Sequence, residues 1–213
     1  MISKADIHNA KPSVDNKILV IDIETTGFLN QGGSIVEIGI VQLDLSNGQI
    51  TTVYDSLLKE DIFSEKHLLP PFGWIFENSD LTTADLNNAP DAKDVLEEVQ
   101  SILSEYPLGC TAYNKRFDFG FLCDRGLEIK ELPCPMILST EICRLPKRNG
   151  YAGYKWPSVQ EAFEYFFPDV EYTERHRGAD DAHHEAMIVY ELFKRGAFKV
   201  DGFKDAEATN GNN

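Results

Sequence analysis

The 213-residue sequence contains no long apolar run. No stretch approaches the roughly 18 consecutive apolar residues that a membrane-spanning helix requires. The N-terminal segment from Met1 to Lys17 is polar and carries both signs of charge, which argues against a signal peptide. These absences exclude a membrane protein from the expected classes and predict a cytoplasmic location.

Cysteine is also scarce. The four cysteines, Cys110, Cys123, Cys134 and Cys143, form no Cys-x-x-Cys pair. Such spacing excludes a disulfide scaffold and suggests neither a zinc site nor redox chemistry. We therefore expect four buried, reduced thiols.

Basic residues are outnumbered, with 20 Lys and Arg against 35 Asp and Glu and a net charge of −15. Phosphate binding is normally driven by Lys and Arg, so this charge weighs against a passive DNA-binding module. It weighs less against a hydrolase that holds cations with carboxylates, because two bound divalent ions would offset about four charges locally.

The body of the sequence, residues 17–198, is long enough for one well-buried domain and shows no internal repeat. Residues 1–16 form a polar tail before it. Residues 199–213 are poor in apolar side chains, and we expect them to form a disordered tail.

Three strand patterns follow one another at the start of the body. The run Ile18 to Ile23 is apolar and rich in β-branched residues, which is typical of a central strand covered on both faces. Ser34 to Leu45 and Gln49 to Leu58 are the second and third strands, with a hairpin turn at Asn47-Gly48. The short connections predict an antiparallel start to the sheet.

Apolar residues at helical spacing dominate the second half. The expected helices are one capped by Asp91, one from about Phe117 to Arg125, one that begins with a Ser158–Glu161 capping box, and one from about Asp180 to Arg195. A fourth strand is expected at residues 110–113, and a weaker fifth near Met136 to Ser139. The order predicts an α/β domain with a mixed five-stranded sheet, three antiparallel strands followed by parallel additions, flanked by helices.

Asp22 and Glu24 lie at the end of the first strand. Side chains two residues apart on a strand point to the same side, so two carboxylates converge at one edge of the sheet. A divalent cation is an economical partner for them, and hard oxygen ligands favour Mg²⁺ or Mn²⁺. Alone, the Asp-x-Glu pair is a weak signal, because a solvated strand end explains it equally well.

Two further motifs place carboxylates beside element ends. Asp118 closes the sequence Asn114-Lys115-Arg116-Phe117-Asp118 at an expected strand-to-helix junction, where ligands gather in α/β sheets. Asp181 begins the last helix, five residues after His176. In isolation, each acid is explained by favourable charge at a helix start. Their occurrence in one chain with Asp22 and Glu24 favours one shared site.

The segments Asp-Ile-Glu-Thr-Thr-Gly (22–27), Asn-Lys-Arg-Phe-Asp (114–118) and His-Arg-Gly-Ala-Asp-Asp-Ala (176–182) resemble the three motifs of the DEDDh family of 3′–5′ exonucleases. The resemblance runs from about Lys17 to Gly196 and implies a ribonuclease H-like fold. This chain departs from the family in one place, because Tyr113 stands where the family often has a histidine.

The resemblance implies roles for five residues. Asp22, Glu24, Asp118 and Asp181 become the ligands of two Mg²⁺ or Mn²⁺ ions, and His176 becomes the general base. The family's spacing of five residues from histidine to aspartate selects Asp181 over its neighbour Asp180. Two ions together activate water and stabilise a leaving oxygen, and an imidazole can accept the proton of that water at neutral pH.

The resemblance also implies a nucleic-acid partner with a free 3′ end and the release of nucleoside 5′-monophosphates. The residues expected to contact the terminal nucleotide are Thr25, Thr26, Gly27, Phe28, Asn114, Lys115 and Arg116. Core packing explains Phe28 equally well. His183 and His184 are expected on the surface of the last helix.

A further cationic stretch runs towards the third motif. Arg144, Lys147, Arg148, Lys155, Arg175 and Arg177 are interleaved there with Tyr151, Tyr154 and Trp156. The pattern suits a single strand held by phosphate contacts and base stacking. A solvated loop explains it equally well.

Three functions remain open at this point. Hydrolysis of single-stranded DNA is the first, RNA 3′-end trimming is the second, and a non-catalytic subunit that binds a polymerase is the third. Four clustered carboxylates without metal would cost stability, which weighs against the third. The sequence leaves undecided whether a polymerase or a second copy of the chain is a partner, and what the aromatic segment Pro70 to Phe76 does.

Overall fold

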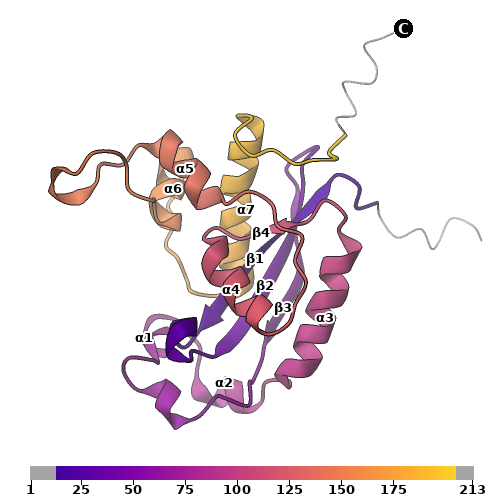
Figure 1. Cartoon of the computed structure of the whole chain (residues 1–213), viewed down its shortest axis with the longest axis vertical. Coiled ribbons are helices and arrows are strands. Elements are labelled where there is room, and N and C mark those ends of the chain that lie inside the picture. The colour runs from indigo at the N-terminus through magenta and orange to yellow at the C-terminus, as the bar shows by residue number, and fades with distance from the viewer. Residues whose placement is uncertain (1–12, 205–213) are drawn as a thin grey trace, which may run out of the picture.

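The computed structural model describes residues 13–204 (Figure 1). Residues 1–12 and 205–213, the larger parts of both predicted tails, lie outside the described residues. The packed body extends beyond the predicted end at residue 198, because Val200 and Phe203 pack against the core and Phe203 meets the ring of Phe193 edge-on at 5.1 Å.

Four strands form one mixed sheet in the order β3-β2-β1-β4. The strands are β1 (Lys17–Thr25), β2 (Ile35–Asp44), β3 (Ile50–Leu57) and β4 (Cys110–Thr111). β2 pairs antiparallel with both β1 and β3, whereas β4 lies parallel to β1. The predicted antiparallel start and parallel addition are confirmed.

The predicted fifth strand near Met136 to Ser139 is wrong, because these residues belong to helix α5 (Pro135–Cys143). Pro135 occupies the first turn of that helix, where the missing N–H of proline is tolerated. At the sheet edge beside β4, the chain makes only an isolated bridge from Cys110 to Glu131. Pro133 has no N–H to extend this pairing.

The helices cover both faces of the sheet (Figure 1). They are α1 (Trp74–Asn78), α2 (Thr83–Asn87), α3 (Ala92–Glu105), α4 (Lys115–Asp124), α5, α6 (Val159–Phe166) and α7 (Gly178–Lys194). The predicted Asp91 cap and Ser158–Glu161 capping box are confirmed. None of these helices is long and apolar enough to cross a membrane.

Alternation along β1 decides which face each side chain joins. Leu19, Ile21 and Ile23 pack with the helices α3 and α4, whereas Ile18 and Val20 pack with α6 and α7. The even-numbered positions continue towards the carboxyl end of the strand. Residues 22 and 24 therefore lie on the face that α7 covers.

Two glycines allow α7 to lie directly on the sheet. A β-carbon at Gly39 would come within 1.9 Å of the carbonyl carbon of Gly178, and one at Gly178 within 2.6 Å of the Gly39 nitrogen. Gly39 is the β2 partner of Asp22. This close approach places the first turn of α7 beside the acidic end of β1.

Cys110, Cys134 and Cys143 are buried free thiols, as expected, but Cys123 is exposed. Cys123 lies near the end of α4, on the side of that helix that faces away from its buried neighbours Phe121 and Leu122. The expectation of four buried cysteines is therefore wrong for this residue.

Candidate active site

The carboxyl end of β1 carries the first two acidic residues. Asp22 is partly buried, and Glu24 is buried opposite Glu37 of β2. A register shift between Glu24 and Thr25 ends the regular pairing at this point. Two carboxylates therefore lie at the end of β1, where its regular pairing with β2 stops.

Asp118 joins them from the first turn of α4. Its Oδ1 accepts a long hydrogen bond of 3.4 Å from the backbone N–H of Ile23, the residue between Asp22 and Glu24. The side chain is buried. The second motif is thus held directly against the strand that carries the first.

Asp181 lies buried in the first turn of α7 and accepts three hydrogen bonds. Its Oδ1 accepts from the Tyr172 hydroxyl at 3.2 Å and from the Arg175 N–H at 3.3 Å, and its Oδ2 accepts from the Arg177 N–H at 2.9 Å. Asp180 instead lies 3.8 Å from both Arg175 and His184. Asp181, the residue that the spacing selected, is the one beside the other acids.

His176 lies on the loop before α7 in a left-handed backbone conformation, with φ of 55°. Its ring meets the exposed indole of Trp74 edge-on, at 4.7 Å between centroids. Ligand atoms of Glu24, His176 and Asp181 all lie within 4.8 Å of one another. A left-handed backbone is strained for histidine, so the surrounding contacts hold this ring in place.

A cavity of about 510 Å³ opens at this end of the sheet. Asp22, Glu24, Asp118 and His176 line it. Asp181 contacts the same group through its proximity to Glu24 and His176. The structure therefore brings all five predicted catalytic residues together, although they span 160 positions of the chain.

Two further carboxylates in this cavity were missed by the sequence reasoning. Glu185 is buried one helical turn after Asp181, and its Oε2 accepts the Tyr113 backbone N–H at 3.1 Å. Glu174 is partly buried two residues before His176. Both line the cavity. The spacing of four residues from Asp181 could have identified Glu185, because such positions share a helix face.

The acids raise one another's pKa values. Burial, with repulsion from Asp181 and Glu37, raises the pKa of Glu24 to about 9. Burial raises the pKa of Asp118 to about 7. Burial and neighbouring carboxylates likewise raise the pKa values of Asp22 and Glu185 well above their usual range. A cluster of hard oxygen donors with this much repulsion fits divalent cations such as Mg²⁺ or Mn²⁺.

The turn after β1 lines the same cavity from Thr25 to Phe28. The Thr25 hydroxyl donates to the Gly27 carbonyl at 3.0 Å, and the buried Thr26 hydroxyl accepts the Ser34 N–H at 2.9 Å. Both hydroxyls therefore shape the turn. Phe28 is 60% exposed and meets Phe117 edge-on at 6.3 Å, which favours a surface for stacking over core packing.

The three residues predicted from the second motif separate in space. Asn114 lines the cavity, and Arg116 lines a larger neighbouring one. The Lys115 ammonium instead donates to Glu131 at 2.8 Å and to the Leu132 carbonyl at 2.9 Å. The ion pair with Glu131 directs the side chain to the β4 edge, and the predicted substrate contact of Lys115 stays a prediction.

The aromatic segment Pro70 to Phe76 is divided between cavity and core. Pro71 and Trp74 line the cavity, whereas Ile75 is buried in a small core of its own. The Gly73 N–H donates to the Thr26 carbonyl at 3.0 Å. A β-carbon at Gly27 would lie 2.7 Å from the Phe72 ring. The segment thus forms a wall of the cavity against the first motif.

The histidines of α7, predicted on the helix surface, are partly covered there. His184 packs against Tyr172 at 4.3 Å and Phe163 at 5.4 Å between centroids, and both His183 and His184 are partly buried. Tyr172, on the segment before α7, packs against His184, which helical periodicity alone does not reveal.

Comparisons with known proteins agree with this geometry. The family model RNase_T, described as exonuclease, matches residues 19–189. Over 190 residues the chain is 27% identical to the DNA polymerase III of PolC type from Bacillus subtilis. The matched region covers 88% of this chain and 12% of the polymerase. The chain thus spans about an eighth of the length of that relative.

Two solved structures show the same fold. The nuclease domain of 3′hExo, a DEDDh family member bound to rAMP, has a TM-score of 0.62 at 16% identity and covers 87% of this chain and 96% of that domain. Exonuclease I of E. coli in complex with a dT13 oligonucleotide has a TM-score of 0.60 at 12% identity, over 84% of this chain and 41% of that enzyme. The predicted ribonuclease H-like fold class is confirmed, with four strands in the described residues instead of five.

Proposed function

Since the chain belongs to the RNase_T family of DEDDh 3′–5′ exonucleases, we propose that it removes nucleotides from the 3′ end of single-stranded DNA and releases nucleoside 5′-monophosphates. The observation that carries this proposal is that ligand atoms of Glu24, His176 and Asp181 lie within 4.8 Å of one another, beside the cavity that Asp22 and Asp118 also line. A passive binding domain has no use for so many mutually repelling acids beside an imidazole.

Four carboxylates are the proposed ligands of two Mg²⁺ or Mn²⁺ ions: Asp22, Glu24, Asp118 and Asp181. When bound, the ions lower the pKa of an attacking water and stabilise charge on the leaving 3′ oxygen. The raised pKa values of Glu24 and Asp118 support this assignment. Burial causes both shifts, with repulsion from other carboxylates added at Glu24, and a nearby cation would favour the charged form of each acid.

His176 is the proposed general base. Its side chain is partly buried and lines the cavity, so its ring can reach a water there while remaining fixed. The edge-on contact with Trp74 limits rotation of the ring. The residue's role is to take the proton of the water that attacks the terminal phosphodiester.

The 3′ end of the DNA strand is proposed to lie against the turn from Thr25 to Phe28. The residues of that turn and Asn114 line the cavity, and the exposed Phe28 ring offers a stacking surface for a base. Arg116 lies farther along the surface, where it can meet a following phosphate.

DNA is proposed ahead of RNA because the matched relative is named a DNA polymerase and the complex of exonuclease I contains dT13. RNA trimming stays as the alternative, because the 3′hExo domain is bound to rAMP. A polymerase or a second copy of this chain are the proposed protein partners, and the cytoplasm is the proposed location.

The experiment uses a 5′-labelled single-stranded DNA with Mg²⁺ or Mn²⁺. We expect a ladder of products that shorten from the 3′ end, no reaction in EDTA, and no reaction when the 3′ terminus is chemically blocked. A blocked terminus that is cut at the normal rate would exclude exonuclease action. An RNA of the same sequence, degraded faster than the DNA, would instead establish the alternative substrate.

A further inference from the structure

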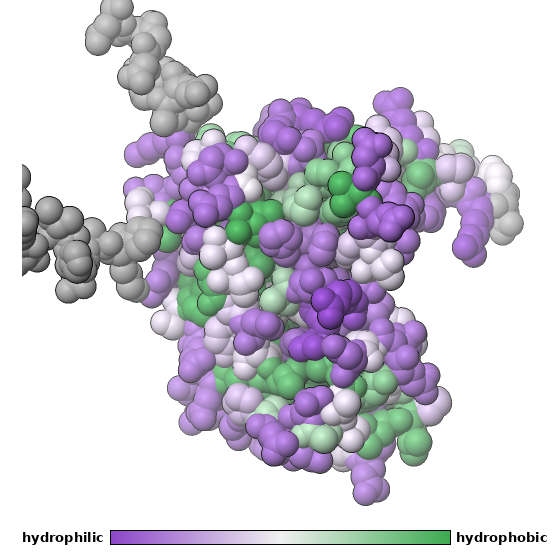
Figure 2. Space-filling model, turned by 180° about the vertical axis from the view of Figure 1, so that it is seen from behind, coloured by the Kyte–Doolittle hydropathy of each residue, from purple (hydrophilic) through white to green (hydrophobic). Residues whose placement is uncertain are grey.

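Residues 144–157, between α5 and α6, form an arm that projects from the body (Figures 1 and 2). We name them the basic arm. The arm contains Arg144, Lys147, Arg148 and Lys155 and no acidic residue, in a chain with 20 basic and 35 acidic residues. A cationic segment in so acidic a chain points to an anionic partner.

The root of the arm is fixed beside the active-site cavity. The hydroxyl of Tyr113, the residue before Asn114, donates to the carbonyls of Pro157 at 3.1 Å and Ser158 at 3.2 Å. Tyr113 itself lines the cavity. The residue that departs from the family pattern therefore connects the second motif to the arm.

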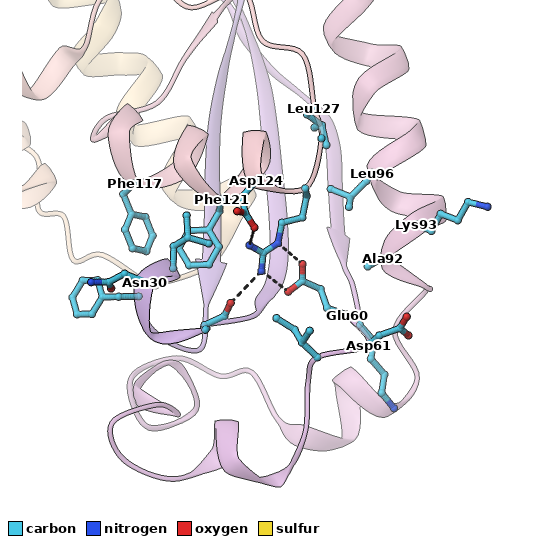
Figure 3. Close-up of a pocket in the computed structure, with 18 of the residues that line it drawn as sticks. Asn30, Glu60, Asp61, Ala92, Lys93, Leu96, Phe117, Phe121, Asp124 and Leu127 are labelled. Atoms are coloured by element: carbon cyan, nitrogen blue, oxygen red, sulfur yellow. Dashed lines mark hydrogen bonds and ion pairs between the residues drawn. The ribbon is translucent and has the colours of Figure 1, made fainter.

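Trp156 links the arm to a second, larger cavity of about 1440 Å³. Figure 3 shows this cavity between α4, which carries Phe117, and α3, which carries Leu96. It shares Phe28, Asn114 and Phe117 with the active-site cavity. A strand that leaves the catalytic end can therefore pass over Phe28 and Asn114 towards Trp156.

Several cations nearer the catalytic residues are already bound. The pairs are Lys115 with Glu131, Arg125 with Glu60, and Arg177 with Glu37 and Asp80. These guanidinium and ammonium groups hold the fold together. Arg116 remains available for one following phosphate, so phosphates farther upstream require cations from elsewhere.

Two of the four cations of the arm are engaged by neighbouring side chains, and two are not. Lys155 binds Glu161, and Arg144 lies over the ring of Tyr154 at 6.0 Å. Lys147 and Arg148 are exposed and have no ion-pair partner among residues 13–204. Lys147 and Arg148 are therefore the cations that the arm can offer to phosphate groups.

Large aromatic side chains accompany these cations. Trp156 is 65% exposed and Tyr151 is 72% exposed. Exposed aromatic rings beside free cations are the combination that binds single strands, by stacking on bases and contacting phosphates. The same chemistry does not suit an acidic polypeptide, which offers no bases to stack.

From these observations we propose that the basic arm binds the single strand upstream of the bond that is cut, with Lys147 and Arg148 on its phosphates and Trp156 against a base. This proposal rests on the proposed function, because it concerns the same strand whose 3′ end enters the cavity. According to this proposal, the affinity for long DNA strands depends on residues of the basic arm and not only on the five catalytic residues.

The test measures equilibrium binding of 5′-fluorescein-labelled single-stranded DNA by anisotropy, in the full chain with Asp118→Asn so that the strand is not consumed. The variant Lys147→Gln/Arg148→Gln is compared with Lys199→Gln/Lys204→Gln. The control removes the same charge from exposed positions beyond the far end of α7.

For a strand of about 20 nucleotides, we expect the arm variant to bind at least about tenfold more weakly, and the slope of log affinity against log salt to fall by about 1.4, or 0.7 per lost phosphate contact. The loss on a trinucleotide should be under about twofold, because so short a strand does not reach the arm. The control should bind like the parent. Equal losses in both variants, or an unchanged slope, would overturn the proposal.

Trp156→Ala provides a second, independent measurement. Its exposed side chain can be removed without opening the core. Loss of one stacked base should weaken binding of the long strand by about fivefold or more while leaving the salt slope unchanged. Unchanged affinity would exclude Trp156 from strand binding.

The binding assay also separates this proposal from the proposed function. A parent chain that hydrolyses DNA but whose arm variants bind normally would refute the arm alone. Displacement of the strand by poly-glutamate at equal charge concentration would show that the arm accepts acidic polypeptides, and would refute the assignment to nucleic acid.

Discussion

Two groups of buried acids in this molecule are held in opposite ways. Glu60 is surrounded by donors. The Arg125 guanidinium lies at 2.8 and 3.0 Å, shown by the dashed lines at Glu60 in Figure 3. The Ser34 hydroxyl donates at 2.9 Å and the Ile35 N–H at 3.0 Å. The acids of the cavity, such as Asp22 and Glu24, have mainly one another as charged neighbours.

This difference distinguishes acids that hold the fold from acids that can bind a ligand. A buried carboxylate with its own guanidinium is compensated in place, so it is unavailable to a ligand and removal of its partner is costly. A buried carboxylate that faces other carboxylates lowers stability until a cation arrives. Burial alone therefore does not identify a functional acid, whereas burial without a cationic partner does.

The largest expected effect comes from removing one acid of the cavity. Asp118→Asn should lower the rate of DNA hydrolysis by about a thousandfold or more, because a carboxylate that holds charge at the reacting phosphate is lost. The metal-free protein should be as stable as before or more stable, because repulsion is relieved. Asp94→Asn, exposed on α3, is the matched control and should keep full activity. A strongly destabilised Asp118→Asn would remove the distinction drawn here.

Removal of the guanidinium that pairs with Glu60 should instead lower the stability of the fold. Arg125→Met leaves Glu60 buried without its cation, which should reduce the free energy of unfolding by about 3 kcal/mol. Arg175→Met, at a 62% exposed side chain 3.8 Å from Asp180, should change it by less than about 1 kcal/mol. Urea denaturation measures both, and similar values for the two variants would contradict the comparison.

Substitutions at His176 test its proposed role as the general base. His176→Ala should slow hydrolysis by at least about a hundredfold, the lower range for a lost general base. Because residue 176 has a left-handed backbone, His176→Asn is a second variant, since asparagine tolerates that conformation. Added imidazole should partly restore the rate of the alanine variant. Near-normal rates in both variants would remove His176 from its proposed role.

The five candidate catalytic residues could be predicted because they lie in three short motifs that resemble those of the DEDDh family. Asp22 and Glu24 share a strand face, and Asp118 and Asp181 begin helices, so short-range rules place each of them. The ion pair of Lys115 and the helix at the expected fifth strand could not be predicted, for another reason. The Lys115–Glu131 ion pair joins residues that are distant in sequence, and the four residues near Met136 are too few to distinguish a strand from a helix.

Glu185 belongs to both groups of buried acids. It accepts the Tyr113 N–H and also faces Asp22 and Asp118. Glu185→Gln keeps an acceptor for that N–H but removes the charge, so we expect Mn²⁺ affinity to fall by about tenfold and the metal-free protein to become more stable. Calorimetric titration with Mn²⁺ measures the first effect. Unchanged affinity would leave Glu185 with a purely structural role.

The smallest expected effect is a dependence of stability on pH in the absence of metal. The pKa values of Glu24 and Asp118 rise on folding from 4.5 and 3.8 to about 9 and about 7, so the folded chain holds protons that the unfolded chain releases. Stability from this source is complete below pH 4 and is lost as the pH rises towards 9, because the unfolded state then binds fewer protons.

In EDTA, the melting temperature should therefore decline by a few degrees between about pH 5 and pH 9, and the decline should be weaker in Glu24→Gln. Mg²⁺ should raise the melting temperature more at about pH 8 than at about pH 6, because ions and protons compete for the same oxygens. Thermal denaturation measures all of these shifts. An equal effect of Mg²⁺ at both pH values would mean that the ion binds somewhere other than among these raised carboxylates, and the contrast with Glu60 would then have no chemical consequence.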